Sequence, residues 1–264
     1  ALVVPLMFSA ASADFWFRRF SVENGLSSNS VRAIVQDKYG FLWFGSDDGL
    51  NRYDGITMKQ YKLNPQGANE YISSLYDTSD KIWVGIDEGV YTYDYETETF
   101  TPFDIVTSRQ VGIKTTVSHI TEDKDGNLWF STVGQGIFKY NVAKQYLEQY
   151  EFRGANGSMA SVLVDSENQI WAVTNWGTPT ISKLNKAENT FEPFCITYET
   201  DAGNSNSLVM LEDSEHALWL GTWESGLQKI DRHTGKAVIY LHPSAGKGLS
   251  LIHISEPTRL RCIS

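Results

Sequence analysis

The sequence predicts an all-β fold: a β-propeller of four-stranded antiparallel blades, five of which are visible. Two observations predict it. A tryptophan directly preceded by leucine or isoleucine recurs five times, and the spacings between successive copies are 40, 46, 42 and 48 residues. Short apolar segments around each copy are separated by turns that contain Asp, Gly and Asn. Short strands joined by such turns and repeated at this period are typical of propeller blades.

The four strands of a blade follow one another in the same order in every unit. The first has apolar residues three apart, such as Val31 and Ile34, and a polar turn leads from it to the tryptophan strand. A turn with a glycine, Gly49 in the first unit, leads to the third strand. Fourth strands are expected at residues 58–63, 100–103, 146–152, 191–194 and 238–241. No helix is expected, because no segment keeps the helical spacing of apolar residues for three turns.

The repeated tryptophans are assigned to structure rather than to chemistry. They are Trp43, Trp83, Trp129, Trp171 and Trp219. A single four-stranded blade cannot bury both of its faces, so blades must stack around an axis. Burying roughly 150–250 Å² of indole on such a face contributes about 4–6 kcal/mol before entropy costs.

Both ends of the chain depart from the repeat. Residues 1–13 are apolar, too short to span a bilayer and end in Ala-Ser-Ala, which predicts the remnant of a secretory signal. A buried first strand is the alternative for this segment. Residues 14–250 are assigned to the blades, whereas residues 251–264 abandon the pattern and look like a non-native tail. Residues 15–21 resemble a fourth strand although the fifth unit already has one, which predicts a fragment of a larger ring.

Charge and composition exclude several functions. The chain has 22 Lys and Arg against 32 Asp and Glu, a formal charge of −10, and no basic run. Contact with nucleic acid is therefore not expected, because such affinity comes largely from basic side chains on phosphates. Two cysteines and no Cys/His spacing typical of zinc predict neither a disulfide framework nor a metal, and no cofactor is expected.

The first unit carries the motif V-x-x-I-x-x-D-x-x-G-x-L-W-x-G followed by G-L-x-x-Y-D, between Val31 and Asp54. This motif resembles the two-component regulator propeller repeat, and residues 20–27 resemble the start of the mature sensor in hybrid two-component systems of Bacteroides-type bacteria. The resemblance covers roughly residues 15–250. It implies the first, seven-bladed propeller of a periplasmic sensor histidine kinase that recognises glycan-derived oligosaccharides and regulates polysaccharide utilisation genes.

The same resemblance implies partners beyond the ligand. A second propeller and downstream domains would belong to the same full-length chain, which would be a homodimer anchored in the inner membrane. No residue of this chain is expected to perform phosphotransfer, so the chain itself is not expected to be an enzyme.

The location of a ligand site follows from strand direction. Because consecutive strands alternate in direction, the turns between second and third strands emerge at the same end as the connections between blades. The extra length behind the longer spacings falls there, in residues 104–114, 175–179 and 196–207. Candidate ligand-binding residues at this end are Trp176, Trp223, Glu224, Asp47, Asp48 and Arg109.

Aromatic planes beside carboxylates suit a carbohydrate, whose apolar face packs on a ring while its hydroxyls need directional partners. Arg109 is a candidate partner for an acidic sugar. The alternative for Trp176 and Trp223 is that they only fill gaps between blades.

Two other functions stay open at this point. One is an exported propeller glycosidase or lyase, and the other is a protein-interaction scaffold. The turn before Trp129 resembles the Asp-box of sialidase-like propellers only superficially, because Lys124 and Leu128 stand where that box needs Asp and Thr.

Overall fold

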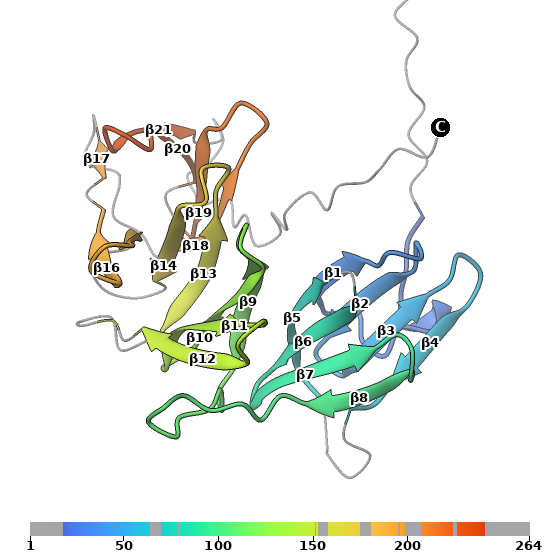
Figure 1. Cartoon of the computed structure of the whole chain (residues 1–264). Coiled ribbons are helices and arrows are strands. Elements are labelled where there is room, and N and C mark those ends of the chain that lie inside the picture. The colour runs from blue at the N-terminus through green and yellow to red at the C-terminus, as the bar shows by residue number, and fades with distance from the viewer. Residues whose placement is uncertain are drawn as a thin grey trace, which may run out of the picture.

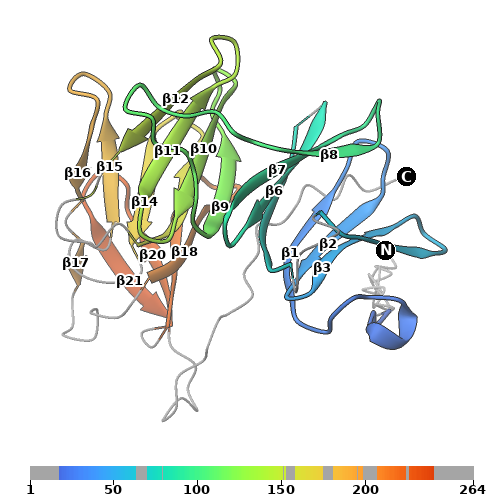
Figure 2. The ribbon, with the colours of Figure 1, turned by 90° about the horizontal axis from the view of Figure 1, so that it is seen from below.

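Five antiparallel sheets stand side by side as propeller blades (Figures 1 and 2), which confirms the predicted fold class. This computed structural model describes residues 18–63, 70–78, 80–150, 152, 158–174, 181–194, 196–198, 207–223 and 226–240. The proposed signal remnant at residues 1–13 and the tail at 251–264 lie outside the described residues.

Each blade contains four consecutive strands paired in chain order. Blade one consists of β1 (Val31–Gln36), β2 (Leu42–Ser46), β3 (Gly49–Tyr53) and β4 (Met58–Tyr61). Blade two consists of β5 (Ile72–Asp77), β6 (Lys81–Ile86), β7 (Gly89–Asp94) and β8 (Thr99–Pro102). Blade three consists of β9 (Val117–Glu122), β10 (Asn127–Thr132), β11 (Gly136–Asn141) and β12 (Tyr146–Tyr150). Blade four consists of β13 (Met159–Val164), β14 (Ile170–Thr174), β15 (Ile181–Asn185) and β16 (Thr190–Pro193). Blade five consists of β18 (Ser207–Glu212), β19 (Leu218–Thr222), β20 (Leu227–Ile230) and β21 (Lys236–Tyr240), with a short additional strand β17 (Thr197–Tyr198).

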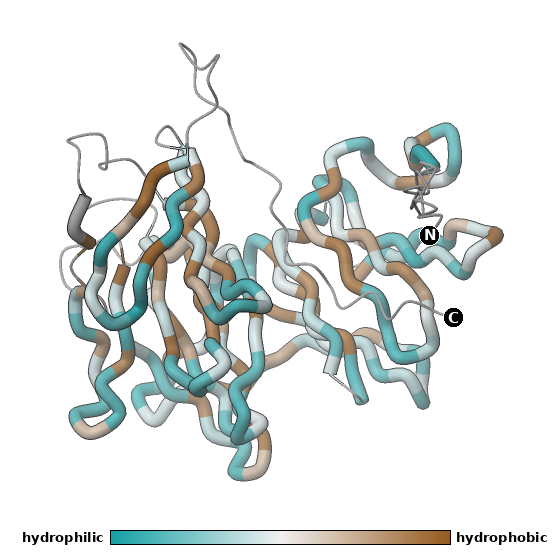
Figure 3. The backbone as a smooth tube through the Cα atoms, turned by 90° about the horizontal axis from the view of Figure 1, so that it is seen from above, coloured by the Kyte–Doolittle hydropathy of each residue, from teal (hydrophilic) through white to brown (hydrophobic). Residues whose placement is uncertain are grey.

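The hydrophobic core lies in the junctions between neighbouring blades. At the first junction, Trp43 and Leu50 of blade one share a buried cluster with Ile72, Val84 and Tyr93 of blade two. Four of the five repeated tryptophans are at most 6 % exposed, and Trp219 is half-buried. These tryptophans therefore fill the junctions between blades, as a structural role requires. Figure 3 shows the resulting alternation of hydrophobic and hydrophilic positions along the strands.

An aspartate joins the tryptophan strand to the turn before it. In blade one, the Trp43 indole N–H donates to Asp37 Oδ2 at 2.8 Å, while Asp37 Oδ1 accepts the backbone N–H groups of Tyr39 and Phe41. The same arrangement links Trp129 to Asp123, Trp171 to Asp165 and Trp219 to Asp213. One carboxylate thus closes the turn and satisfies a buried indole.

Small residues after the tryptophan let adjacent blades approach closely. A Cβ atom at Gly45 would lie 2.6 Å from the Ile72 side chain, and one at Gly85 would lie 2.9 Å from Cβ of Val117. These glycines bring the second strand of one blade against the first strand of the next.

The two long connections each pair with an outer strand. Between blades four and five, β17 pairs in parallel with β21. Between blades two and three, Thr107 forms a parallel bridge with Leu147 of β12. The extra residues predicted from the long spacings therefore cover the outer edge of the blade that follows them, where unpaired backbone groups would otherwise be exposed.

The N-terminal segment differs from the expected strand. Arg18–Ser21 forms no strand, and a single 3-10 turn, η1 (Val22–Asn24), follows. Phe20 packs on the face of blade one that is turned away from blade two, with its ring centroid 4.9 Å from that of Tyr53. Phe20, one of the aromatic residues that looked like a fourth strand, thus covers part of blade one with its side chain. Nowhere among the described residues is there a helix long and apolar enough to cross a membrane.

Candidate functional site

The turns between second and third strands lie at the same end as the connections between blades. In blade one, the N–H of Gly49 donates to the carbonyl of Glu70 at 2.7 Å. In blade three, the side chain of Gln135 bonds the carbonyl of Gly112 and the N–H of Lys114 in the incoming connection, at 3.2 and 2.9 Å. The shared end predicted from strand direction is confirmed.

The candidate ligand residues are distributed over this end. Asp47 and Asp48 form the turn between β2 and β3, and Arg109 lies in the connection from blade two to blade three. Trp223 follows β19 in blade five and is 49 % exposed. The structure thus brings Asp47 and Asp48 together and places Arg109 and Trp223 on other blades. Trp176 and Glu224 lie outside the described residues, and a ligand role for the whole set stays a prediction.

Asp47 is engaged by a neighbouring arginine. Nε of Arg32 lies 2.7 Å from Asp47 Oδ1, and its guanidinium sits 5.2 Å from the centroid of the Tyr71 ring. The hydrogen bond from Arg32 lowers the pKa of Asp47. A ligand that used this carboxylate would have to compete with Arg32 for it.

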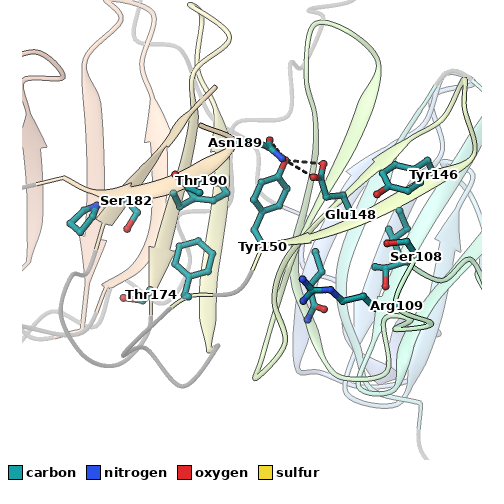
Figure 4. Close-up of a pocket in the computed structure, with 15 residues that line it drawn as sticks. Ser108, Arg109, Tyr146, Glu148, Tyr150, Thr174, Ser182, Asn189 and Thr190 are labelled. Carbon is teal, nitrogen blue, oxygen red and sulfur yellow. Dashed lines mark hydrogen bonds between the residues drawn. The ribbon is translucent and has the colours of Figure 1, made fainter. Parts of the chain in front are cut away.

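A cleft of about 740 Å³ opens between the outer strands of blades three and four. Arg109 lines it together with Ser108 from the connection and Tyr146 from β12 (Figure 4). Thr190 and Ser182 of blade four line the opposite side. Among the described residues that line the cleft, Arg109 is the only basic one.

A hydrogen-bonded group links the two walls. The Tyr150 hydroxyl donates to Oδ1 of Asn189 at 2.8 Å and lies 3.1 Å from Oε2 of Glu148. The Asn189 amide donates to Oε1 of Glu148 at 2.7 Å. Burial, followed by the charge of Glu148, raises the pKa of the Tyr150 hydroxyl, so it remains a protonated donor. Figure 4 shows these three side chains meeting across the cleft.

The floor is aromatic and closely packed. The rings of Tyr150 and Phe191 meet edge to face at a centroid distance of 5.4 Å, and the Trp129 ring packs on Tyr150 at 5.5 Å with a tilt of 31°. These residues belong to the buried cluster that joins blades three and four. The cleft therefore rests on a closely packed junction between these two blades.

Sequence reasoning found Arg109 but missed Tyr146, Glu148 and Asn189. All three lie in or beside strands whose sequences show nothing unusual. Glu148 and Asn189 are 41 residues apart, which is about one repeat. The one available signal was the length of the connection at residues 104–114. No group of three or more His, Cys, Asp and Glu side chains suited to a metal ion occurs within the part of the chain that the structure describes.

Residues 25–48 and 112–134 match the two-component regulator propeller family. The chain resembles this family in these two stretches. It is also similar to histidine kinase P4 of Formosa agariphila, with 43% identity over 65 residues that make up 25% of this chain and 5% of that protein. The chain thus spans about a twentieth of the length of this relative.

Solved structures share the fold of these repeats. The extracellular domain assigned to the hybrid two-component system BT3049 of B. thetaiotaomicron has a TM-score of 0.70 at 24% identity, over 85% of this chain and 32% of that chain. A streptogramin B lyase has a TM-score of 0.63 at 18% identity, over 84% of this chain and 72% of that chain. Identities this low carry the architecture and no activity.

Proposed function

We propose that this chain is a ligand-sensing propeller of a hybrid two-component sensor kinase, exported to the periplasm, and that its ligand is a glycan-derived oligosaccharide. Two observations carry the sensor assignment: residues 25–48 and 112–134 match the two-component regulator propeller family, and 65 residues of the chain are 43% identical to a histidine kinase. The fold shared with an extracellular two-component domain supports the same assignment.

The mixed lining of the cleft supports a sugar ligand. A sugar ring presents an apolar face that packs on aromatic side chains and hydroxyls that need donors and acceptors. Tyr146 is 46 % exposed and offers a ring, while Arg109, Ser108 and Gln149 offer polar groups around it.

Signalling would proceed as a population shift. The ligand must bind one arrangement of the full-length sensor better than another, because only this difference in binding free energy can reach the kinase. Moving an equilibrium from 1:99 to 99:1 needs a difference of about 5.5 kcal/mol. The second propeller, the downstream domains, a homodimer and the control of polysaccharide utilisation genes belong to this proposal.

Two experiments test the two halves of the proposal. Reading the source DNA beyond the codon for Ser250 should reveal further blades, a membrane helix and a kinase phosphoacceptor; a stop codon there would overturn the sensor assignment. Calorimetry of the 264-residue chain against neutral and acidic oligosaccharides should give saturable binding for at least one of them. A folded chain that binds none would overturn the ligand assignment.

The same titrations distinguish a sensor from an enzyme. A sensor should return each oligosaccharide unchanged after prolonged incubation, as judged by mass spectrometry. Accumulation of cleaved or eliminated product would instead assign glycosidase or lyase activity to the propeller.

A further inference from the structure

The cleft between blades three and four combines one cation with an exposed aromatic ring on the same wall. Figure 4 shows Arg109 and Tyr146 on the side formed by the connection and β12. The connection is held there by the parallel bridge between Thr107 and Leu147. Backbone pairing therefore holds Arg109 at the wall to which β12 and its Tyr146 belong, two residues after the bridge.

The acidic residue among the described residues that line the cleft, Glu148, has a partner on blade four. Its Oε1 accepts the Asn189 amide at 2.7 Å, and its Oε2 lies 3.1 Å from the Tyr150 hydroxyl oxygen. The bond from Asn189 turns one oxygen of this carboxylate toward blade four.

The charge of the whole chain makes this cation informative. With a net charge of −10, the chain repels anions in general, so an anionic ligand needs a specific cation to bind. Arginine suits this task, because its planar guanidinium donates two parallel hydrogen bonds to a carboxylate.

We propose that this cleft binds a sugar unit that carries a carboxylate, with the apolar face of the sugar on Tyr146 and the carboxylate paired with Arg109. The inference rests on the proposed oligosaccharide ligand and names its chemical class. Thr190, which is exposed on the facing wall, then hydrogen-bonds a hydroxyl of the next sugar unit.

The experiment is calorimetry of the whole chain with oligouronates of three or four units, each compared with its carboxyl-reduced, neutral counterpart. We expect an oligouronate to bind at low salt, and its neutral counterpart to bind at least about 10-fold more weakly because the charge-assisted pair is lost. Raising the salt concentration should weaken binding of the oligouronate, since the cleft is open to solvent.

Variants assign this preference to the cleft. Arg109→Ala should weaken oligouronate binding about 10-fold and leave the neutral sugar unchanged, whereas Arg109→Lys should lose less because it keeps the charge without the paired hydrogen bonds. Tyr146→Ala should weaken both sugars. Arg19→Ala is the matched control, because it removes an exposed guanidinium elsewhere and should leave both affinities within twofold.

The outcomes separate the two proposals. Neutral sugars that bind as tightly as oligouronates, or binding of oligouronates that survives Arg109→Ala, would overturn the acidic-sugar site while oligosaccharide sensing stands. If no oligouronate binds but a neutral sugar does, the result is the same. Absence of binding by any sugar overturns both. Circular dichroism and the melting temperature of each variant show that the fold is intact.

Discussion

The five described blades form a row that has internal junctions between neighbouring blades and two end faces, on blades one and five. Equivalent residues line the internal junctions and the end faces, but they differ in how deeply they are buried. The Tyr150 ring packs on Trp129 at a centroid distance of 5.5 Å and is 6 % exposed, because blade four covers it. The Tyr240 ring packs on Trp219 at 5.4 Å with a similar tilt, yet Tyr240 is 51 % exposed. The same kind of aromatic pair is therefore buried in a junction in blade three and lies at the surface in blade five.

Blade one, at the opposite end of the row of blades, shows the same contrast. Ile34 of blade one is 45 % exposed, whereas its equivalent in blade three, Ile120, is 2 % exposed and packs against blade two. Phe20 and Leu26 cover part of this face. The comparison teaches that each blade carries two complementary faces and that most of its stability comes from neighbours rather than from its own sheet.

The largest expected effect is the removal of an internal tryptophan. Trp129→Ala should cost about 3–5 kcal/mol, because it leaves a cavity in the junction between blades three and four. Trp219→Ala should cost about half as much or less, since among the described residues no further blade packs on this half-buried indole. Urea unfolding followed by tryptophan fluorescence and circular dichroism measures both.

Equal losses for the two tryptophan variants would contradict the comparison. In that event the end face of blade five would be as well packed as an internal junction. Far-UV circular dichroism before unfolding shows whether Trp129→Ala still folds, and a failure to fold counts as the larger effect.

The second effect concerns the aspartate that closes a turn. Asp123→Ala should cost about 2–3 kcal/mol, because the Trp129 indole N–H and the N–H of Asn127 lose a charged acceptor inside the protein. Asp125→Ala, in the same turn but exposed, is the control and should change stability by less than about 0.5 kcal/mol. Similar melting temperatures for the two variants would show that Asp123 does not stabilise the fold.

This aspartate also shows how far the sequence can predict the fold. Strand order, the five blades and the buried tryptophans follow from the repeat alone. In blade two, however, Asp77 precedes Trp83 by six residues as in the other blades, yet the pairing of Tyr76 with Trp83 puts Thr78 at the closing position. A turn that is one residue shorter changes the register, and spacing does not reveal it.

The candidate site was predictable only in part. The alternation of strand direction identified the end of the molecule that holds the long connections, and hence Arg109. The cleft itself depends on the parallel bridge from Thr107 to Leu147 and on the bond between Glu148 and Asn189, which are contacts between distant segments. No periodicity records such contacts, because they depend on how two blades diverge at their outer edges.

A third expected effect tests the close approach at an internal junction. Gly85→Ala should cost about 1–3 kcal/mol, because its Cβ would lie 2.1 Å from the Ser74 hydroxyl of the same blade and 2.9 Å from Cβ of Val117 in the next blade. Gly112→Ala is the matched control, since the atom nearest to its added Cβ, Cγ1 of Val106, would lie at an ordinary contact distance of 3.4 Å. Thermal melts of the two variants should differ, and a stable Gly85→Ala variant would show that blades two and three can separate without loss.

The smallest expected effect is a pH dependence at the junction of blades one and two. Burial raises the pKa of Asp77 to about 6, although the Tyr95 hydroxyl donates to it at 2.6 Å. A carboxyl whose pKa is raised by folding stabilises the native state while it is protonated. Its contribution is therefore present below the unfolded pKa of 3.8 and is lost as the pH rises through about 6.

The variant Asp77→Asn isolates this contribution, because its amide cannot ionise and still accepts the Tyr95 hydroxyl. Relative to this variant, the unsubstituted chain should lose about 1 kcal/mol of stability between pH 4 and pH 7, a figure reduced for the partial exposure of the site. Urea midpoints measured across that range provide the test. Parallel pH profiles for the two proteins would show that Asp77 ionises as freely in the folded chain as in the unfolded one, and that the junction of blades one and two is open to water at this point.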